Sequence, residues 1–196
     1  MRRSREAAAR TRRTAVEAAS RLFRERGIDA VGVRDVMSSV GLTDGGFYRH
    51  FESKEALAAE ACAAACAGSA LGRGPSRSVD AMLQGYLSTA HRDARATGCA
   101  LAALVSEMPR QSGTVRRAYT AGVRAALSRL EQLAPGADAA TRRALLASMI
   151  GALAVARAVD DDELSSSVLE GTRELWTRAL PKRRPVRRRP PSRVNR

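Results

Sequence analysis

The 196-residue chain is 44% hydrophobic but only 4% aromatic, and its formal net charge is +14. This length and hydrophobic content suffice for one or two domains with a buried core, and the abundant alanine favours helices. No run of 18 uncharged apolar residues occurs and the N-terminus lacks the apolar stretch of a secretory signal, so we expect a cytoplasmic protein with no membrane partner.

The chain begins and ends with basic segments. Residues 1–13 contain six arginines and one glutamate, and residues 182–196 contain eight lysines or arginines and no acid, so the charge between them nearly cancels. We predict a basic N-terminal arm over residues 1–12 and a basic disordered tail over residues 181–196, where proline and charge prevent a packed core. Such ends attract nucleic acid through its phosphates, although they can equally be solvated tails.

The first helix is expected over residues 6–26. Ala15, Ala19 and Phe23 recur on one face at helical spacing, and Gly27 supplies a left-handed stop. The apolar face predicts that this helix packs on a core.

A second, short helix is expected over residues 33–40. Its N-cap position is Gly32, which has no side chain to accept a hydrogen bond, and Gly41 ends it. Leu42 is expected to fill the turn that follows. Two helices joined by a short turn containing glycine are typical of a helix-turn-helix unit.

A third, very short helix follows the turn. Thr43 is placed to cap it, and Phe47 and Phe51 take its inward positions. The outward positions are Asp44, Gly45, Tyr48 and Arg49. This arrangement predicts a recognition helix.

Ser53 is expected to cap a fourth helix that ends near residue 67, which completes a DNA-binding domain over residues 13–67. Gly68–Ser78 has the glycine and serine content of a linker. A second helical domain is expected over residues 68–180, with helices at 79–96, 99–108, 113–133, 138–159 and 161–180. The predicted fold is all-α, with about nine helices.

The last two helices carry more apolar surface than one core needs. The helix over 138–159 is apolar on more than one face, which predicts half of a four-helix interface in a two-fold dimer. Two ordinary core helices are the alternative. The predicted interface residues are Leu146, Met149, Ile150, Leu153, Val168, Leu169, Leu175 and Trp176.

The sequence offers little for catalysis or metal binding. Its two histidines, His50 and His91, belong to no triad or metal-ligand spacing, so we expect no enzyme, metal or cofactor. Cys62, Cys66 and Cys99 are expected to be small buried hydrophobic residues, and a redox role for the first two, one turn apart, is the alternative.

Residues 12–62, which contain AVEAASRLFRERGIDAVGVRDVMSSVGLTDGGFYRHFESKEAL, resemble the DNA-binding domain of bacterial TetR-like transcriptional regulators. The pattern Leu-Thr-x-Gly-Gly-Phe-Tyr-x-His-Phe resembles a recurring subgroup of that family. The resemblance implies a homodimer on double-stranded DNA and a second domain that binds a small-molecule effector. By position, it implies DNA contacts from Arg34, Thr43, Asp44, Gly45, Tyr48, Arg49, His50 and Lys54.

Each of these DNA contacts has a rival interpretation. Tyr48 can bind a phosphate or pack against the domain, and Arg49 can bind guanine or only a phosphate. His50 can enter the groove or brace the turn. Asp44 can accept a hydrogen bond from cytosine or stabilise the N-terminus of its own helix. Lys54 lies at the N-terminus of the next helix, which is a position that suits a phosphate.

We therefore hypothesise a repressor that a ligand releases from a palindromic operator. Its ligand residues are expected to be Met82, Tyr86, Leu104, Met108, Tyr119 and Val123, although such a stripe is also typical of plain core. The alternative function is nonspecific or architectural nucleic-acid binding driven by the basic ends.

Overall fold

The computed structural model describes residues 2–69, 71 and 76–181. Every regular element within these residues is helical, which confirms the all-α prediction. The elements are α1 (Arg2–Arg26), α2 (Val33–Ser39), the 3₁₀-helix η1 (Asp44–Arg49), α3 (Lys54–Gly68), α5 (Val79–Tyr86), α6 (Thr89–Asp93), α7 (Ala100–Leu104), the 3₁₀-helix η2 (Met108–Arg110), α8 (Gly113–Leu133), α9 (Ala139–Ala158) and α10 (Asp162–Ala179). Residues 182–196 of the predicted tail and residues 70 and 72–75 of the predicted linker lie outside the described residues.

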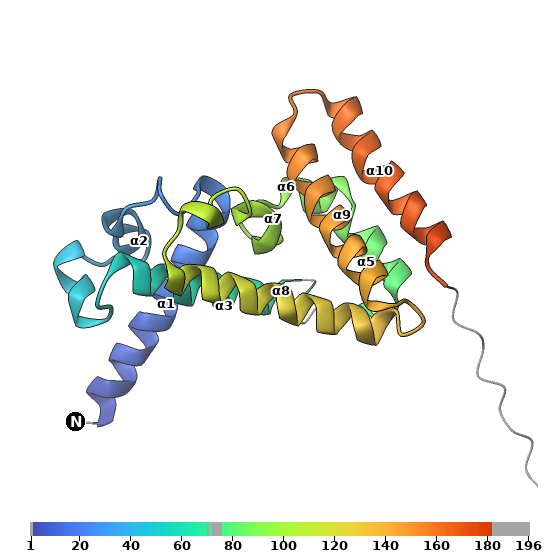
Figure 1. Cartoon of the computed structure of the whole chain (residues 1–196). Helices are drawn as coiled ribbons and strands as arrows, with labels where there is room; N and C mark the ends of the chain where they lie inside the picture. Colours follow the sequence, from blue (N-terminus) through green and yellow to red (C-terminus); the bar gives the residue numbers. More distant parts are fainter. Residues whose placement is uncertain (1, 70, 72–75, 182–196) are drawn as a thin grey trace, which may run out of the picture.

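Helix α3 joins the two parts of the molecule. It packs against α1 in the N-terminal part and against α8 in the second, and Figure 1 shows α8 running alongside it. Gly122 of α8 allows this close approach, since a Cβ there would lie 2.5 Å from the Sγ atom of Cys66 on α3. Further along, α9 packs on α7, α8 and α10. One continuous hydrophobic core therefore runs through both parts.

Helix α1 follows the prediction at its C-terminal end and extends it at its N-terminal end. Ala15, Ala19 and Phe23 are buried, and Gly27 adopts a φ of +89° while its N–H donates to the Phe23 carbonyl at 2.9 Å. The helix already begins at Arg2, so the segment predicted as a basic arm continues α1. The run Glu-Ala-Ala-Ala-Arg within it consists of strong helix formers, which accounts for the extension.

The helix predicted over residues 79–96 is two helices, because polar side chains terminate the first. Helix α5 ends at Tyr86, and the Ser88 hydroxyl caps α6 by accepting from the His91 N–H at 3.2 Å. The His91 ring then joins two backbone segments, with Nδ1 2.7 Å from the Tyr86 carbonyl and Nε2 accepting from the Cys99 N–H at 3.1 Å. Since Nε2 accepts, the proton is on Nδ1 and donates to Tyr86.

The helix predicted over residues 99–108 is also shorter than expected. Helix α7 ends at Leu104, and η2 follows with Pro109 near its start. Proline lacks an N–H group, and its ring would clash with the carbonyl of Val105 in a continuous helix. The predictions for α3, α8, α9 and α10 agree with the structure to within one or two residues.

Among the described helices, α9 is long and apolar enough to cross a membrane by length and composition. A core helix passes the same test, and α9 packs on four neighbouring helices, with Leu145, Met149 and Leu153 fully buried. These contacts explain part of the apolar surface of α9, since 33% of its apolar stretch is buried inside the protein.

Candidate nucleic-acid interface

The turn between α2 and η1 has the geometry of a helix-turn-helix unit. Gly41 adopts a φ of +72°, and the backbone N–H of Leu42 donates to the Met37 carbonyl at 2.9 Å. The prediction that Leu42 fills this turn is only partly right, because 36% of Leu42 is exposed. Val36 and Met37 instead anchor α2 in the core. At the start of α2, the Asp35 carboxylate accepts from the Gly32 N–H at 2.7 Å and so helps to cap a helix whose N-cap lacks a side chain.

Helix η1 presents its polar residues on a buried aromatic base. Phe47 and Phe51 are buried and stacked, with ring centroids 5.3 Å apart. The Tyr48 ring meets Phe47 edge-on at 5.2 Å, yet 75% of Tyr48 is exposed. This exposure disfavours the packing interpretation of Tyr48, and its hydroxyl is free to reach a partner outside the protein.

The start of η1 differs from the prediction in its capping. Thr43 occupies the N-cap position, but its hydroxyl accepts no capping hydrogen bond. The Asp44 carboxylate instead accepts from the Gly45 N–H at 3.1 Å, and the Thr43 carbonyl accepts from the Gly46 N–H at 3.1 Å. The local bond made by Asp44 supports its role at the helix N-terminus. The paired glycines make a regular α-helix costly, which is consistent with a six-residue 3₁₀-helix here.

The remaining predicted DNA contacts lie around η1. Arg34 is exposed in the first turn of α2, and Arg49 is exposed at the end of η1. His50 is half-buried directly after η1. Lys54 opens α3 behind the Ser53 cap, whose hydroxyl accepts from the Ala56 N–H at 3.1 Å. All eight predicted residues thus lie on α2, on η1 and the two residues that flank it, and at the first residue of α3.

Arg12 has a role that the sequence did not reveal. Its Nε donates to Glu60 Oε2 at 3.2 Å, its Nη2 donates to Glu60 Oε1, and its guanidinium carbon lies 4.4 Å from the centre of the Phe51 ring. Arg12 therefore fastens α1 to α3 and to the aromatic base of η1. Its charge is paired within the protein, unlike the solvated charge expected of a basic arm.

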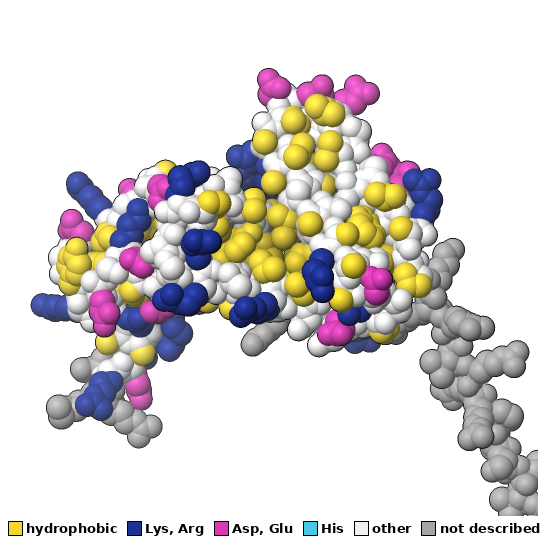
Figure 2. All heavy atoms as spheres, in the orientation of Figure 1, with side chains coloured by type: hydrophobic (Ala, Val, Ile, Leu, Met, Phe, Trp, Pro, Cys, Tyr) yellow, Lys and Arg dark blue, Asp and Glu magenta, His cyan; other side chains and the backbone are white. Residues whose placement is uncertain are grey.

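The predicted ligand residues separate into two groups. Met82, Tyr86, Leu104 and Met108 are buried in the core. Tyr119 and Val123 line an open apolar groove of about 480 Å³ between α8 and α9. Figure 2 shows hydrophobic side chains gathered around this groove. The Tyr119 hydroxyl is already engaged, since it donates to the Leu101 carbonyl at 2.8 Å.

Most of the predicted dimer residues lie inside the protomer. Leu146, Met149, Leu153, Leu169 and Trp176 are buried, because α9 and α10 pack on each other and on the core. Ile150 and Val168 are half-buried, and 55% of Leu175 is exposed. Val155 and Leu164, which are not among the predicted interface residues, are each 47% exposed on the same helix pair.

The three cysteines are free and buried, as expected of small hydrophobic residues. A hydrogen bond between Cys62 and Cys66, together with burial, raises the pKa of Cys66, the same bond lowers the pKa of Cys62, and burial raises the pKa of Cys99. Helix α8 covers Cys66 at Gly122. Because both thiols of the pair are buried, an oxidant has little access to them, and this burial disfavours the redox hypothesis.

An exposed short helix on a buried aromatic base, preceded by a glycine turn and a second helix, defines a helix-turn-helix domain, which is here followed by a larger helical domain. Residues 15–61 match the family model described as bacterial regulatory proteins, tetR family.

Two curated relatives are similar to part of this chain. The chain is 44% identical over 45 residues to the HTH-type transcriptional repressor KstR2 from Rhodococcus jostii, and 40% identical over 47 residues to the HTH-type transcriptional regulator YerO from Bacillus subtilis. The alignments span about a quarter of this chain but only 22% of KstR2 and 16% of YerO.

Solved structures extend the similarity to the whole fold. Escherichia coli NemR in its reduced form gives a TM-score of 0.70 at 19% identity, covering 88% of this chain and 98% of NemR. A TetR-family regulator from Agrobacterium tumefaciens gives 0.68 at 23% identity, covering 89% and 100% of the two chains. A TetR-family regulator from Streptomyces coelicolor gives 0.61 at 26% identity, covering 88% and 96%. The fold is therefore that of TetR-family regulators.

Proposed function

We propose that the protein is a sequence-specific, DNA-binding transcriptional regulator that acts as a repressor. The observation that carries the proposal is η1, where the exposed Tyr48 and Arg49 side chains project from the buried pair Phe47 and Phe51. A hydroxyl and a guanidinium on an exposed short helix can enter a major groove, the first to bind a phosphate and the second to bind a guanine edge. Lys54, at the N-terminus of α3, suits a neighbouring phosphate.

The protein is proposed to work as a homodimer in the cytoplasm. Leu164 and Leu175 on α10 and Val155 on α9 are large apolar side chains that a monomer leaves in water. Two protomers related by a two-fold axis would cover these residues and present two copies of η1 to a palindromic operator, about 34 Å apart. Leu175→Glu is expected to yield monomers in sedimentation experiments, whereas Leu42→Glu, at an exposed leucine far from this face, is expected to leave the dimer intact.

Selection of bound DNA from a random pool tests the proposal most directly. We expect an inverted repeat whose half-site centres lie one duplex turn apart. Tyr48→Phe is expected to weaken binding to all sequences to a similar degree, and Arg49→Lys to reduce the preference at one base position. Selection of unrelated sequences, or of single half-sites by a monomer, would contradict the proposal.

The same experiment separates a regulator from a nonspecific or architectural nucleic-acid binder. A chain ending at Leu180 lacks the basic tail but retains η1. We expect the truncated protein to keep its sequence preference and to show a shallower dependence of affinity on salt, because fewer phosphates are neutralised. Loss of all binding with the tail would favour the nonspecific binder.

The regulator is proposed to be released from DNA by a small molecule bound in the second domain. A ligand that prefers a state with the wrong separation of the two η1 helices would shift the population away from the DNA-bound form. The resemblance of residues 12–62 to TetR-like regulators, which implies a second domain that binds a small-molecule effector, supports this mechanism.

A further inference from the structure

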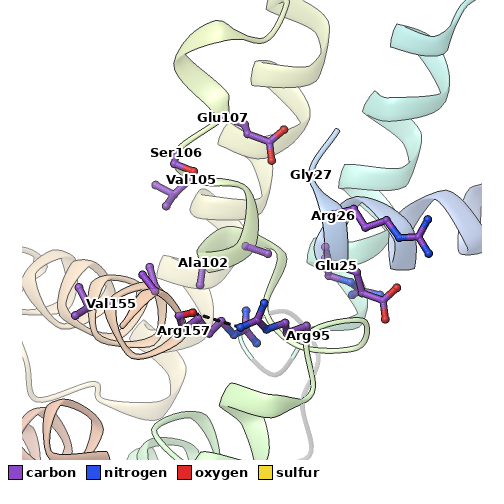
Figure 3. Close-up of a pocket in the computed structure, with 14 residues that line it drawn as sticks. Glu25, Arg26, Gly27, Arg95, Ala102, Val105, Ser106, Glu107, Val155 and Arg157 are labelled. Carbon is purple, nitrogen blue, oxygen red and sulfur yellow. Dashed lines mark hydrogen bonds between the residues drawn. The ribbon is translucent and has the colours of Figure 1, made fainter. Parts of the chain in front are cut away.

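A second cavity, of about 510 Å³, lies where the two domains meet. The last turn of α1 and Gly27 form one wall, and α7, the segment that follows it and the end of α9 form the other. Figure 3 shows Arg95 next to Arg157, with the other labelled side chains spread around them on these elements. Its volume falls in the range of small-molecule sites.

The polar part of the cavity is built from arginines that lack acidic partners. Arg24 donates to the Gly98 carbonyl at 3.4 Å, and Arg95 donates to the Arg157 carbonyl at 3.3 Å. Arg157 itself donates to two backbone carbonyls, each at 3.0 Å. Within the described residues, none of these three guanidinium groups forms an ion pair, and the Nε of Arg24 is buried without any partner.

The acidic groups nearby are already engaged or point elsewhere. Glu107 lines the cavity, but its carboxylate accepts from the Ile28 N–H at 2.8 Å. Asp93 pairs with Arg92 at 2.8 Å, and its charge also acts on Arg95 and Arg157 without an ion pair to either. Glu25 is exposed on the rim. The cavity therefore holds an excess of positive charge, to which Arg26 on the rim contributes as well.

The electrostatics of Arg24 and Arg157 agree with an anion site. Burial lowers the pKa of Arg24, and the nearby charges of Arg21 and Arg157 lower it further. Burial likewise lowers the pKa of Arg157, with a contribution from Arg95. A guanidinium remains charged at any physiological pH, so this environment costs free energy that a bound anion would recover.

The rest of the lining is apolar. Ala102, Ala103, Val105, Ala154 and Val155 supply hydrocarbon surface next to the arginines. A ligand that complements both the arginines and the apolar lining has one acidic group and a hydrocarbon chain.

We propose that this cavity binds an aliphatic carboxylic acid as the effector, with its carboxylate on Arg24, Arg95 and Arg157 and its chain against the alanine and valine side chains. The inference rests on the proposed function, because it specifies the ligand that regulates DNA binding. Planar guanidinium groups match a carboxylate with two parallel hydrogen bonds, which favours this class of anion.

The position of the cavity explains how a bound ligand would affect the DNA interface. Glu107 also accepts from the Asp29 N–H at 3.4 Å, and Gln111 donates to the Asp29 carboxylate at 2.8 Å. These bonds tie the end of α1 to the segment between α7 and α8. Helix α2 begins at Val33, only a few residues after this tie, so a ligand held by both walls repositions α2 and η1 together.

The test uses the full-length protein with hexanoate, octanoate and decanoate as probes, and the corresponding 1-alcohols as neutral controls. Calorimetry measures probe binding, and fluorescence anisotropy measures affinity for the selected operator. We expect the acids to bind at least tenfold more tightly than the alcohols and to weaken operator binding at least fivefold. By linkage, operator DNA should weaken probe binding by the same factor.

Variants locate the site. Arg95→Met and Arg24→Met are each expected to weaken octanoate binding about tenfold, and urea unfolding checks that they remain folded. The matched control is Arg143→Met, which removes the charged side chain lining the apolar groove between α8 and α9 and is expected to change nothing. Octanoate binding that depends on Arg143 and not on Arg95, equal binding of acids and alcohols, or no binding of acids would overturn the inference. Each of these outcomes leaves the proposed function intact if the operator is still bound specifically, and loss of specific operator binding in the absence of probe refutes the function instead.

Discussion

Replacing Gly122 by alanine is expected to destabilise the protein by about 1–2 kcal/mol, although alanine is the better helix former by about 1 kcal/mol. Gly122 is buried near the middle of α8. An added Cβ would lie 2.5 Å from the Sγ and 2.8 Å from the Cβ of Cys66, and 3.4 Å from a methyl group of Leu101. Carbon atoms need roughly 3.5–4.0 Å, so α3 and α8 would have to separate by about 1 Å and loosen the packing between the two domains.

Urea unfolding at one fixed protein concentration measures this effect as a shift of the midpoint to lower urea. The matched control is Gly85→Ala in α5, where an added Cβ meets no atom within 4 Å. This control is expected to stabilise the protein by about 0.5–1 kcal/mol. Combining Gly122→Ala with Cys66→Ala should restore part of the loss, since the nearest atom is removed. A midpoint for Gly122→Ala at or above that of the wild type would refute the reasoning.

Three further changes test other parts of the structure. Tyr48→Phe should leave the urea midpoint unchanged, because the ring is exposed, while it weakens operator binding about fivefold to tenfold in anisotropy titrations. Arg12→Met should destabilise the protein by about 1–2 kcal/mol through loss of its carboxylate and aromatic partners, whereas Arg13→Met, at an exposed neighbour, should change stability by less than about 0.5 kcal/mol. Burial lowers the pKa of His91 below its ordinary value of 6.5, so its contribution to stability is complete above about pH 6.5 and is lost as the pH falls further. His91→Gln should therefore flatten the dependence of the urea midpoint on pH between about 5 and 7.

Features encoded by neighbouring residues were predictable from the sequence. The stop at Gly27, the turn at Gly41 and the cap at Ser53 depend on backbone conformation or on hydrogen bonds three or four residues away, so the sequence displays them directly. The same holds for the buried Phe47 and Phe51 beneath η1. The predictions of the helix-turn-helix geometry and of the all-α fold were confirmed for this reason.

Features made by distant residues were not predictable. Arg12 meets Glu60 across 48 positions, and no local pattern distinguishes it from the solvated arginines beside it. The cavity between the domains joins Arg24 to Arg157 only through the packing of α1, α7 and α9. The helix predicted over residues 79–96 was too long. The apolar spacing continues past Tyr86, but the Ser88 side chain there caps a new helix instead of continuing the first one.

The helical start of α1 changes how the N-terminal charges can be used. Figure 1 shows this end of the helix projecting from the rest of the molecule, and residues 5–10 are exposed. Ten residues of helix span about 15 Å at a fixed angle to the domain, whereas a flexible chain of the same length would sample many directions. Because Arg12 binds Glu60 at the base of this projection, the charges on the projection are held in a defined orientation relative to α3. On a duplex, these charges would contact the same phosphates in every complex. Changes in the length of this segment should therefore alter the operator footprint in steps set by the helical repeat of α1.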